Sequence, residues 1–424
     1  MTYTEALDFI HGIARFGSKP GLRRIKALLD LMGNPQNELK FIHVAGTNGK
    51  GSTCTMLSNV FTQAGYKVGL YISPYVLDFR ERIQINGQMI DPQDLADSTR
   101  EVKRYWDEVD KTGDTPSEFE TLTAVALDYF KKQKPDIVIF EVGMGGRFDA
   151  TNVIDTPEVS VITSLSFDHM EFLGDTIEKI AFEKCGIIKK NGITVCYPQQ
   201  LSGAMEVIKS RCAEEGNPLI VGGEAEILEI SFFGTKIKYA GLTVDIPLIG
   251  MHQVHNTITA LEALKAAKNF PVEEKHILEG IAGTSFPARM EIISKKPLIV
   301  LDGAHNQGGA EALGKALDLL KGKKIHAVMG MLGNKDHTGS LGEILPHCAS
   351  LTAVPIKSNP LSLAPEDLCS VAKPFCADLR TAKTPQEGVD STLQIMGEDD
   401  VILVCGSLYL ACEVRPHLLK IAGR

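Results

Sequence analysis

The stretch FIHVAGTNGKGS, residues 41–52, decides the fold class of this chain. An apolar run at 41–45 leads into the glycine-rich segment Gly46-Thr47-Asn48-Gly49-Lys50-Gly51-Ser52, and apolar residues at helical spacing follow it. A strand, a glycine-rich turn and a helix in this order form a loop whose backbone N–H groups cradle phosphate. The stretch therefore predicts a nucleotide-binding loop at 46–52, in which Lys50 reaches the β- and γ-phosphates and Ser52 ligates Mg²⁺.

This loop departs in two places from the general P-loop pattern. Val44 stands where that pattern has its first glycine, and Gly51 separates Lys50 from Ser52. A glycine-rich turn that binds no ligand is the simpler alternative. The loop by itself indicates a nucleotide, but neither which nucleotide nor which reaction.

Apolar runs alternate with helix-period segments through the first half of the chain. The expected strands lie at 41–45, 68–72, 137–142 and 159–165, and the expected helices between them include 93–109 and 119–132. This alternation is typical of a mostly parallel sheet with helices on both faces. Shorter alternating segments over 225–249 predict antiparallel strands at the sheet edge or in a small flap, and helices are expected at 254–267 and 272–282.

A second α/β pattern begins after the polar segment Ser294-Lys295-Lys296-Pro297. Its expected strands are 298–301, 325–329, 351–354 and 401–404, and its expected helices are 309–320, 364–372 and 386–396. We therefore predict an α/β fold with two domains: a P-loop domain with a mostly parallel sheet at 1–294, and a smaller, Rossmann-like α/β domain at 295–424. The second of these domains, of about 130 residues, lies within the usual range of domain sizes.

Composition narrows the class of protein. The 424 residues are 44% hydrophobic and 23% charged, which suits a soluble protein with sizeable cores. A net charge of −9 argues against nucleic acid or an acidic membrane surface as the main partner. The chain shows no signal peptide and no apolar run of about 18 residues, so we expect it in the cytoplasm. Nine cysteines without a Cys-x-x-Cys pair are expected to be free thiols.

Ligands of open α/β sheets bind beyond the carboxyl ends of the strands, so residues that end the expected strands are candidates for a site. Glu141 ends the run 137–140, where a carboxylate can hold Mg²⁺ opposite the phosphate loop. Ser73 follows the expected strand 68–72 and can also ligate a metal. His169 comes directly after Asp168 and could be a metal ligand, a general base or a structural cap. The glycine-rich loop after Glu141 could equally be a plain surface loop.

Further candidates lie later in the chain. Asp302 and His305 follow the strand 298–301, and Arg289 precedes the domain boundary, where it can reach phosphate. Asn256 lies early on a helix, where capping is the simpler role. Lys184 ends a helix, where a lysine is ordinarily solvated or faces the helix dipole.

Taken together and in order, these segments resemble the Mur ligase superfamily, and within it the family of folylpolyglutamate synthases and dihydrofolate synthases. The resemblance covers nearly the whole chain. The strings that carry it are GTNGKGS at 46–52, SPYVLDFRERIQING at 73–87, EVGMGGRFDATN at 141–152, SFDHMEFLG at 166–174, AFEKCGIIK at 181–189, HQVHN at 252–256, PARME at 287–291, DGAHN at 302–306 and GSLYL at 406–410.

The resemblance implies an ATP-dependent ligase of folate biosynthesis and one-carbon metabolism, which adds L-glutamate to a folate through an acyl phosphate. Its substrates would be ATP, L-glutamate and tetrahydrofolate or dihydropteroate, and we expect a monomer. The implied Mg²⁺ ligands are Ser52, Ser73, Glu141, His169 and a carbamylated Lys184. The implied ATP contacts are Gly46, Thr47, Asn48, Gly49, Lys50, Gly51, Ser52, Asn256, Arg289 and Asp302. The implied catalytic residues are Lys50, His169, Lys184 and His305, with His305 near the γ-phosphate.

Three residues depart from the family's usual pattern: Tyr75 replaces His, Ala288 replaces Gly, and Gln307 replaces Pro. None of them removes a proposed phosphate or metal ligand. A cell-wall ligase acting on a UDP-sugar is the close alternative, but such enzymes usually carry Thr-Thr after the P-loop lysine. A nucleotide switch without ligase chemistry would leave the segments around Lys184 and Asp302 unexplained. The sequence does not choose between the synthase that makes dihydrofolate and the one that extends tetrahydrofolates.

Overall fold

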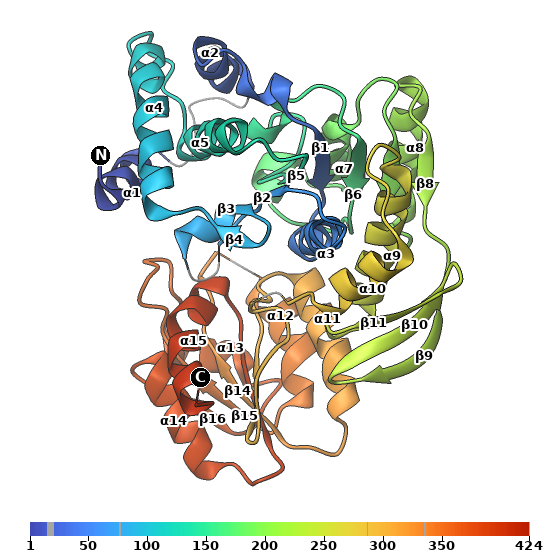
Figure 1. Ribbon diagram of the computed structural model, residues 1–424. Helices are drawn as coiled ribbons and strands as arrows, with labels where there is room; N and C mark the ends of the chain where they lie inside the picture. Colours follow the sequence, from blue (N-terminus) through green and yellow to red (C-terminus); the bar gives the residue numbers. More distant parts are fainter. Residues whose placement is uncertain (15–20, 76–77, 286, 335, 424) are drawn as a thin grey trace. The chain divides into compact units, whose positions relative to one another are not determined.

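The computed structural model describes residues 1–14, 21–75, 78–285, 287–334 and 336–423 (Figure 1). Its internal contacts divide the chain into two compact units. Unit 1 comprises Met1–Glu226, Tyr239–Val244 and His255–Thr284, and unit 2 comprises Ile227–Lys238, Asp245–Val254 and Ser285–Arg424. The division does not fall at a single point of the sequence, because two short segments before residue 255 belong with unit 2.

Unit 1 is built on a mainly parallel sheet with the strand order β4-β3-β2-β5-β1-β6-β7-β8. Its strands are β1 (Phe41–Ala45), β2 (Val68–Tyr71), β3 (Ile83–Ile85), β4 (Gln88–Met89), β5 (Ile137–Glu141), β6 (Val159–Ile162), β7 (Thr194–Cys196) and β8 (Leu219–Val221). Only the edge pairings of β3 with β2 and with β4 are antiparallel among these described strands. Every residue of β1 and β5 is buried, as expected for strands covered on both faces.

Helices surround this sheet in unit 1 (Figure 1). They are α1 (Tyr3–Gly12), α2 (Arg23–Leu31), α3 (Lys50–Gln63), α4 (Pro92–Asp110), α5 (Glu118–Gln133), α6 (Met170–Leu173), α7 (Ile177–Lys184), α8 (Ser202–Glu214), α9 (Met251–Ala266) and α10 (Glu274–Ala282), with 3₁₀ turns at Pro35–Glu38, Phe79–Arg82, Ala150–Val153 and Cys185–Ile187. Local chemistry starts several of them. Ser117 begins α5 with a capping box that its partner Glu120 completes, and Thr176 caps α7.

A separate small sheet has the order β11-β10-β9, with β9 (Glu226–Ser231), β10 (Gly234–Tyr239) and β11 (Leu242–Ile246). The connections are of two residues each, a length that joins antiparallel strands only. The antiparallel strands predicted over 225–249 are therefore present, and they form a sheet of their own.

Unit 2 carries a second sheet, with the order β12-β13-β17-β14-β15-β16. Its strands are β12 (Glu291–Lys295), β13 (Leu298–Leu301), β14 (Ile325–Met329), β15 (Ser350–Ala353), β16 (Leu379–Thr381) and β17 (Val401–Cys405). Its helices are α11 (Gln307–Leu317), α12 (His337–Ile344), α13 (Pro365–Ala372), α14 (Pro385–Ile395) and α15 (Leu408–Ile421), with 3₁₀ turns at Asp318–Leu320 and Leu345–His347. β12 pairs antiparallel with β13, and the other pairings are parallel.

The predicted fold class, α/β with a P-loop sheet and a second α/β part, is confirmed. The domain boundary after Ser294 stays a prediction, and the pairing of β12 with β13 favours an earlier one because residues 291–294 lie on the sheet of unit 2. The strand predicted at 159–165 is too long. β6 ends at Ile162, because the backbone after it turns to accept hydrogen bonds from the phosphate loop.

Two further sequence predictions can be compared with the structure. All nine cysteines are free, as predicted. In the part of the chain that the structure describes, no helix is both long and apolar enough to cross a membrane.

A buried ion pair joins α2 to α5 and is expected to stabilise unit 1. Arg24 Nε lies 3.0 Å from Glu120 Oε2, and the two side chains are 10% and 7% exposed. Glu120→Gln would leave the guanidinium buried without its counter-charge, so we expect the free energy of unfolding to fall by about 3 kcal/mol. Urea unfolding measures this loss. Glu101→Gln, which breaks an exposed pair with Arg104, is the control and should cost less than about 0.5 kcal/mol; equal losses would contradict the assigned strength of the buried pair.

Candidate active site

The phosphate loop joins β1 to α3. Gly49 precedes the first residue of α3 and has a φ of 83°, a left-handed conformation that favours glycine. Lys50 folds back over the loop, and its Nζ donates to the carbonyl oxygens of Gly46 at 3.1 Å and Thr47 at 3.3 Å. The lysine ammonium is therefore held against the loop backbone.

The segment after β6 braces this loop. The backbone N–H groups of Thr47 and Asn48 both donate to the carbonyl of Ser164, at 2.8 and 3.2 Å. The Thr47 hydroxyl donates to the carbonyl of Ser166 at 3.1 Å, and the Asn48 amide reaches the Ser166 hydroxyl at 3.2 Å. These bonds bring the phosphate loop next to the segment that carries Asp168 and His169.

Glu141 ends β5, which lies beside β1 in the sheet with Glu141 opposite Val44. The side chain is buried, and its Oε2 accepts a hydrogen bond from the backbone N–H of Ser73 at 2.9 Å. Burial raises the pKa of Cys54 on α3; Glu141 raises it further and Lys50 opposes this. The charges of Glu141 and Lys50 therefore both act on the thiol of Cys54 in α3. The structure brings Glu141, Ser73 and the phosphate loop to one end of the sheet.

Lys184 is the last residue of α7 and is 5% exposed. Its Nζ donates to the carbonyl of Gly46 at 2.8 Å, so two lysines, Lys50 and Lys184, converge on one carbonyl of the phosphate loop. Burial and, to a smaller extent, the Lys50 cation lower the pKa of Lys184 to about 7, although Asp168 and Asp149 oppose the shift. A solvated lysine, the simpler expectation for a helix end, is wrong here.

The glycine-rich loop after β5 holds Lys184 in place. A Cβ on Gly146 would lie 2.7 Å from the carbonyl oxygen of Lys184, so only glycine permits this approach. The Asn152 amide donates to the carbonyls of Arg147 and Gly186, both at 3.1 Å. The loop is therefore packed against the end of α7 and is more than a plain surface loop.

Asp149 is a buried carboxylate in this loop to which sequence analysis gave no role. The N–H of Met144 donates to it at 2.9 Å, and the hydroxyl of Thr151 at 2.6 Å. Thr151 is in turn 2.9 Å from Nε2 of the buried His43 on β1. Burial raises the pKa of Asp149, and these hydrogen bonds oppose the shift. The signal in the sequence was an acid three positions after Gly146, the last glycine of the loop.

His169 and Asn256 occupy different surroundings. His169 directly precedes α6 and has a φ of 49°; its side chain is 48% exposed, and its Nε2 lies 3.9 Å from Asp168 Oδ2. Asn256 is buried inside α9, not at its start, so the simpler expectation of a cap is wrong. A Cβ on Gly49 would collide with the Asn256 side chain, which places Asn256 directly against the phosphate loop.

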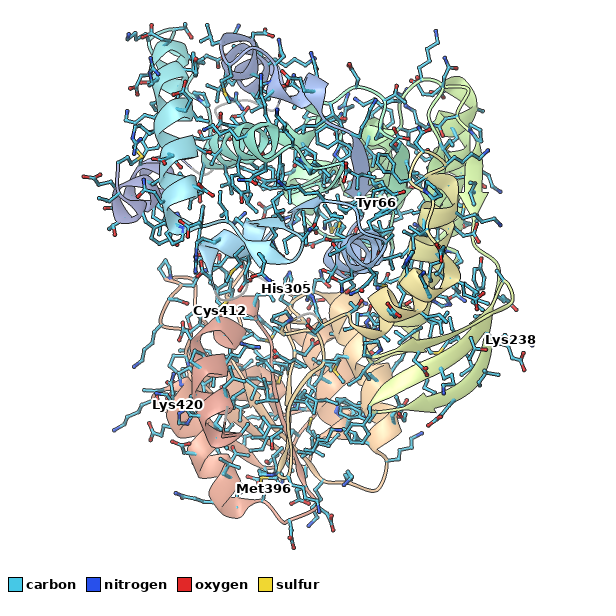
Figure 2. All side chains as sticks on the ribbon, in the orientation of Figure 1. Tyr66, Lys238, His305, Met396, Cys412 and Lys420 are labelled. Atoms are coloured by element: carbon cyan, nitrogen blue, oxygen red, sulfur yellow. The ribbon has the colours of Figure 1, made fainter. Side chains whose placement is uncertain are left out.

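Arg289, Asp302 and His305 lie together in unit 2, where Figure 2 labels His305. Asp302 follows β13 and accepts hydrogen bonds from the N–H groups of Met290 and Ala304, both at 2.8 Å. Burial raises the pKa of Asp302, and the Arg289 cation opposes the shift. His305 Nδ1 lies 2.9 Å from the Gly303 carbonyl.

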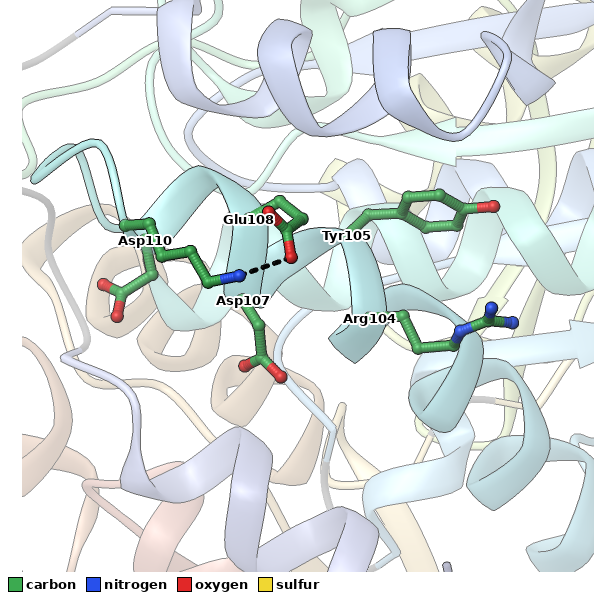
Figure 3. Close-up of a pocket in the computed structure, with 6 residues that line it drawn as sticks. Arg104, Tyr105, Asp107, Glu108 and Asp110 are labelled. Atoms are coloured by element: carbon green, nitrogen blue, oxygen red, sulfur yellow. Dashed lines mark hydrogen bonds and ion pairs between the residues drawn. The ribbon is translucent and has the colours of Figure 1, made fainter.

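A broad hollow elsewhere in unit 1 is lined by Arg104, Tyr105, Asp107, Glu108, Asp110 and Lys111 (Figure 3). All six residues belong to the end of α4 or follow it directly, and Lys111 there pairs with Glu108 at 2.6 Å. None of the residues proposed for the site lines this hollow. We assign it no role in the chemistry.

Most of the side chains proposed as ligands near the phosphate loop offer oxygen atoms, the ligand type that Mg²⁺ prefers. Mg²⁺ prefers oxygen ligands and usually keeps several from water and phosphate. Glu141, Ser52 and Ser73 offer oxygen, whereas His169 offers nitrogen. Within the described ranges no group of three or more His, Cys, Asp or Glu side chains could hold a metal. A site here would therefore depend on hydroxyls, on phosphate oxygens and on any carboxylate that Lys184 acquires.

Comparison with known proteins shows the family of this chain. Residues 44–264 match the Mur ligase middle domain, and residues 288–408 match the glutamate ligase domain of Mur ligases. The chain is 33% identical over 432 residues to dihydrofolate synthase/folylpolyglutamate synthase of Bacillus subtilis, covering 98% of this chain and 99% of that protein. It is 34% identical to folylpolyglutamate synthase of Lacticaseibacillus casei, covering 99% of each.

A solved structure of a related enzyme has a similar fold over nearly the whole chain. Mycobacterium tuberculosis folylpolyglutamate synthase complexed with ADP superimposes with a TM-score of 0.89 at 29% identity, over 98% of both chains. The chain belongs to the folylpolyglutamate synthase family of Mur ligases. For this family member, the departures noted in the sequence can now be placed.

Each departure in this Mur ligase has a structural setting. Ala288 has a φ of 54°, which explains why glycine is usual there. Gln307 is the first residue of α11, a position that proline favours but other residues fill readily. Tyr75 packs edge-on against Phe79 at 5.7 Å, with Arg82 5.1 Å above its ring. Val76 and Leu77, which follow in the same motif, lie outside the described residues.

Gly49 provides a direct test of the phosphate loop. We expect Gly49→Ala to weaken ATP binding at least tenfold, because the new methyl group meets the buried Asn256 side chain and because alanine at this φ costs about 1 kcal/mol. Isothermal titration with ATP measures the change. Gly65→Ala is the matched control, since Gly65 has a φ of 89° with open space around it. Equal affinities in both variants would contradict the assignment of the loop.

Proposed function

We propose that this Mur ligase uses ATP to add L-glutamate to a folate. Relatives named folylpolyglutamate synthase, one of them solved in complex with ADP, support this proposal. The observation that carries the proposal at the site is the convergence of Lys50 and Lys184 on the carbonyl of Gly46, within a strand–loop–helix that suits phosphate. Phosphoryl transfer needs mainly positioning and neutralised charge, which such a loop and the Lys50 ammonium supply.

The reaction proceeds in two balanced steps. A carboxylate oxygen of the folate attacks the γ-phosphorus of ATP, the bond from that phosphorus to the β–γ bridging oxygen breaks, and ADP leaves. The amine nitrogen of L-glutamate then attacks the acyl carbon, inorganic phosphate leaves, and the amine loses a proton as the amide forms. Lys50 would hold the charge of the phosphates in both steps, and Asn256 would fix the loop that binds them.

We propose Ser52, Ser73, Glu141, His169 and a carbamylated Lys184 as the residues that hold Mg²⁺. The ion would neutralise phosphate charge as it develops. The buried amine supports carbamylation, because a pKa of about 7 leaves much of it neutral at physiological pH, and a carbamate forms from the neutral amine and CO₂. From unit 2 we propose Arg289, Asp302 and His305 as contacts of the nucleotide. A monomeric, cytoplasmic enzyme stays a prediction.

The assay that tests this function follows ADP release with ATP, Mg²⁺ and L-glutamate, with tetrahydrofolate or dihydropteroate in parallel. Product masses identify the acceptor. A gain of one glutamyl unit on tetrahydrofolate supports polyglutamylation, a gain on dihydropteroate supports dihydrofolate synthesis, and gains on both support a bifunctional enzyme. ATP binding without a gain on either acceptor would reject the proposed substrates and favour a nucleotide switch.

A further inference from the structure

A strained turn in unit 2 presents Arg289. Its two neighbours, Ala288 and Met290, have φ values of 54° and 48°, and such left-handed conformations cost non-glycine residues about 1 kcal/mol each. Both neighbours are buried, whereas Arg289 is partly exposed. A turn of this kind persists only where the surrounding structure determines it.

Three hydrogen bonds determine the turn. The Ala288 N–H donates to Glu291 Oε2 at 3.0 Å, and the Ala288 carbonyl accepts from the Gly303 N–H at 2.8 Å. The Met290 N–H donates to Asp302 Oδ2 at 2.8 Å. Two carboxylates, those of Glu291 and Asp302, therefore fix the backbone on either side of Arg289.

One of these carboxylates is itself held by an arginine far along the chain. Arg415 on α15 forms a two-pronged ion pair with Glu291: its Nη2 lies 2.6 Å from Oε1, and its Nε lies 2.9 Å from Oε2 and 3.0 Å from Oε1. The two side chains are only 15% and 17% exposed. Cys412 and Lys420 mark the course of α15 in Figure 2. Such a planar, bidentate pair restricts the rotation of the carboxylate, which a single bond would not.

We propose that Arg415 and Glu291 are positioning residues that set the orientation of Arg289 toward the nucleotide. The inference rests on the proposed role of Arg289 and extends it. Arg415 fixes the Glu291 carboxylate, Glu291 fixes the N–H of Ala288, and the turn aims the guanidinium of Arg289. Neither positioning residue needs to contact the substrate itself.

Steady-state kinetics with Arg415→Met and Glu291→Gln test the proposal. Because small misplacements of a positioned group are costly, we expect kcat/KM for ATP to fall about tenfold to a hundredfold. The KM for L-glutamate should change little, whereas the melting temperature should fall, because the pair that is broken is mostly buried. Arg415→Lys keeps the charge but not the planar fork, so it should recover only part of the loss. Arg380→Met is the control, since it breaks an exposed two-pronged pair with Asp378 elsewhere in unit 2 and should leave kcat/KM for ATP unchanged.

A double-mutant cycle with Arg289→Ala separates positioning from a general effect on structure. If Arg415 acts through Arg289, the double variant should be no worse for ATP than Arg289→Ala alone. Multiplied losses would overturn the proposal, as would an Arg415→Met variant that behaves like Arg380→Met. If Arg289→Ala leaves kcat/KM for ATP unchanged, the proposed role of Arg289 fails first, and a loss in Arg415→Met would then need another cause.

Discussion

Replacing Lys184 with alanine is expected to lower turnover by about 10²–10³-fold, the scale seen when one preorganised charged group is removed from a site. The amine lies against the phosphate loop, buried, with its Nζ 2.8 Å from the Gly46 carbonyl. As a carbamate it would reverse its charge and face the site as a carboxylate. A small carboxylate such as formate should therefore restore part of the activity of the variant.

The pH dependence has a definite sign. Burial, assisted by the Lys50 cation, lowers the pKa of Lys184 to about 7, so the amine is protonated below that pH and neutral above it. Only the neutral amine adds CO₂. Enzyme depleted of CO₂ should thus regain activity with bicarbonate more readily as pH rises through about 7.

A spectroscopic measurement distinguishes a carbamate from an ordinary lysine. With ¹³C-bicarbonate, the wild type should show a carbamate resonance that Lys184→Ala lacks. Lys179→Ala, on the exposed side of the same helix α7 and paired with Asp175, is the control and should change neither the resonance nor the turnover. Normal turnover in Lys184→Ala, or the same resonance in that variant, would contradict the carbamate.

The features that sequence could predict are local ones. The strand, glycine-rich turn and helix at 41–63 are contiguous, so the phosphate loop follows from residues close in the chain. Glu141 was found because strand ends in a parallel sheet meet at one edge. The end of β6 was misplaced, since Leu165 makes the apolar pattern look as if it continues past Thr163 and Ser164. The chain turns aside there, where the N–H groups of Thr47 and Asn48 donate to the Ser164 carbonyl.

The features that sequence could not predict depend on contacts between distant segments. In the sequence, Lys184 is indistinguishable from any other lysine at a helix end, and only the family resemblance assigned it a role. Its setting depends on distant segments: Gly146 packs against its backbone, and the Gly46 carbonyl accepts a hydrogen bond from its Nζ. Asp149 gains its surroundings from Thr151 and from His43, which lies 108 positions away from Thr151. The pair of Arg415 with Glu291 joins residues 124 positions apart, and β12, which carries Glu291, was absent from the expected strands.

Replacing Glu141 with glutamine should raise the Mg²⁺ concentration needed for half-maximal activity about tenfold or more, because a carboxylate ligand of the ion becomes a neutral amide. The fold should survive. A glutamine carbonyl can still accept the hydrogen bond that the Ser73 N–H donates at 2.9 Å, and the shape of the side chain is retained. A Mg²⁺ titration of turnover, together with urea unfolding, measures both effects.

Glu120→Gln is the natural counterpart, since it makes the same chemical change at another buried carboxylate of unit 1. It should destabilise the protein by breaking the pair with Arg24 while leaving the Mg²⁺ titration unchanged. Glu141→Gln should shift the Mg²⁺ titration and leave the free energy of unfolding nearly unchanged. If both variants shift the Mg²⁺ titration equally, the effect of Glu141 comes from general loosening of unit 1, and if Glu141→Gln titrates like the wild type, Glu141 does not hold the metal.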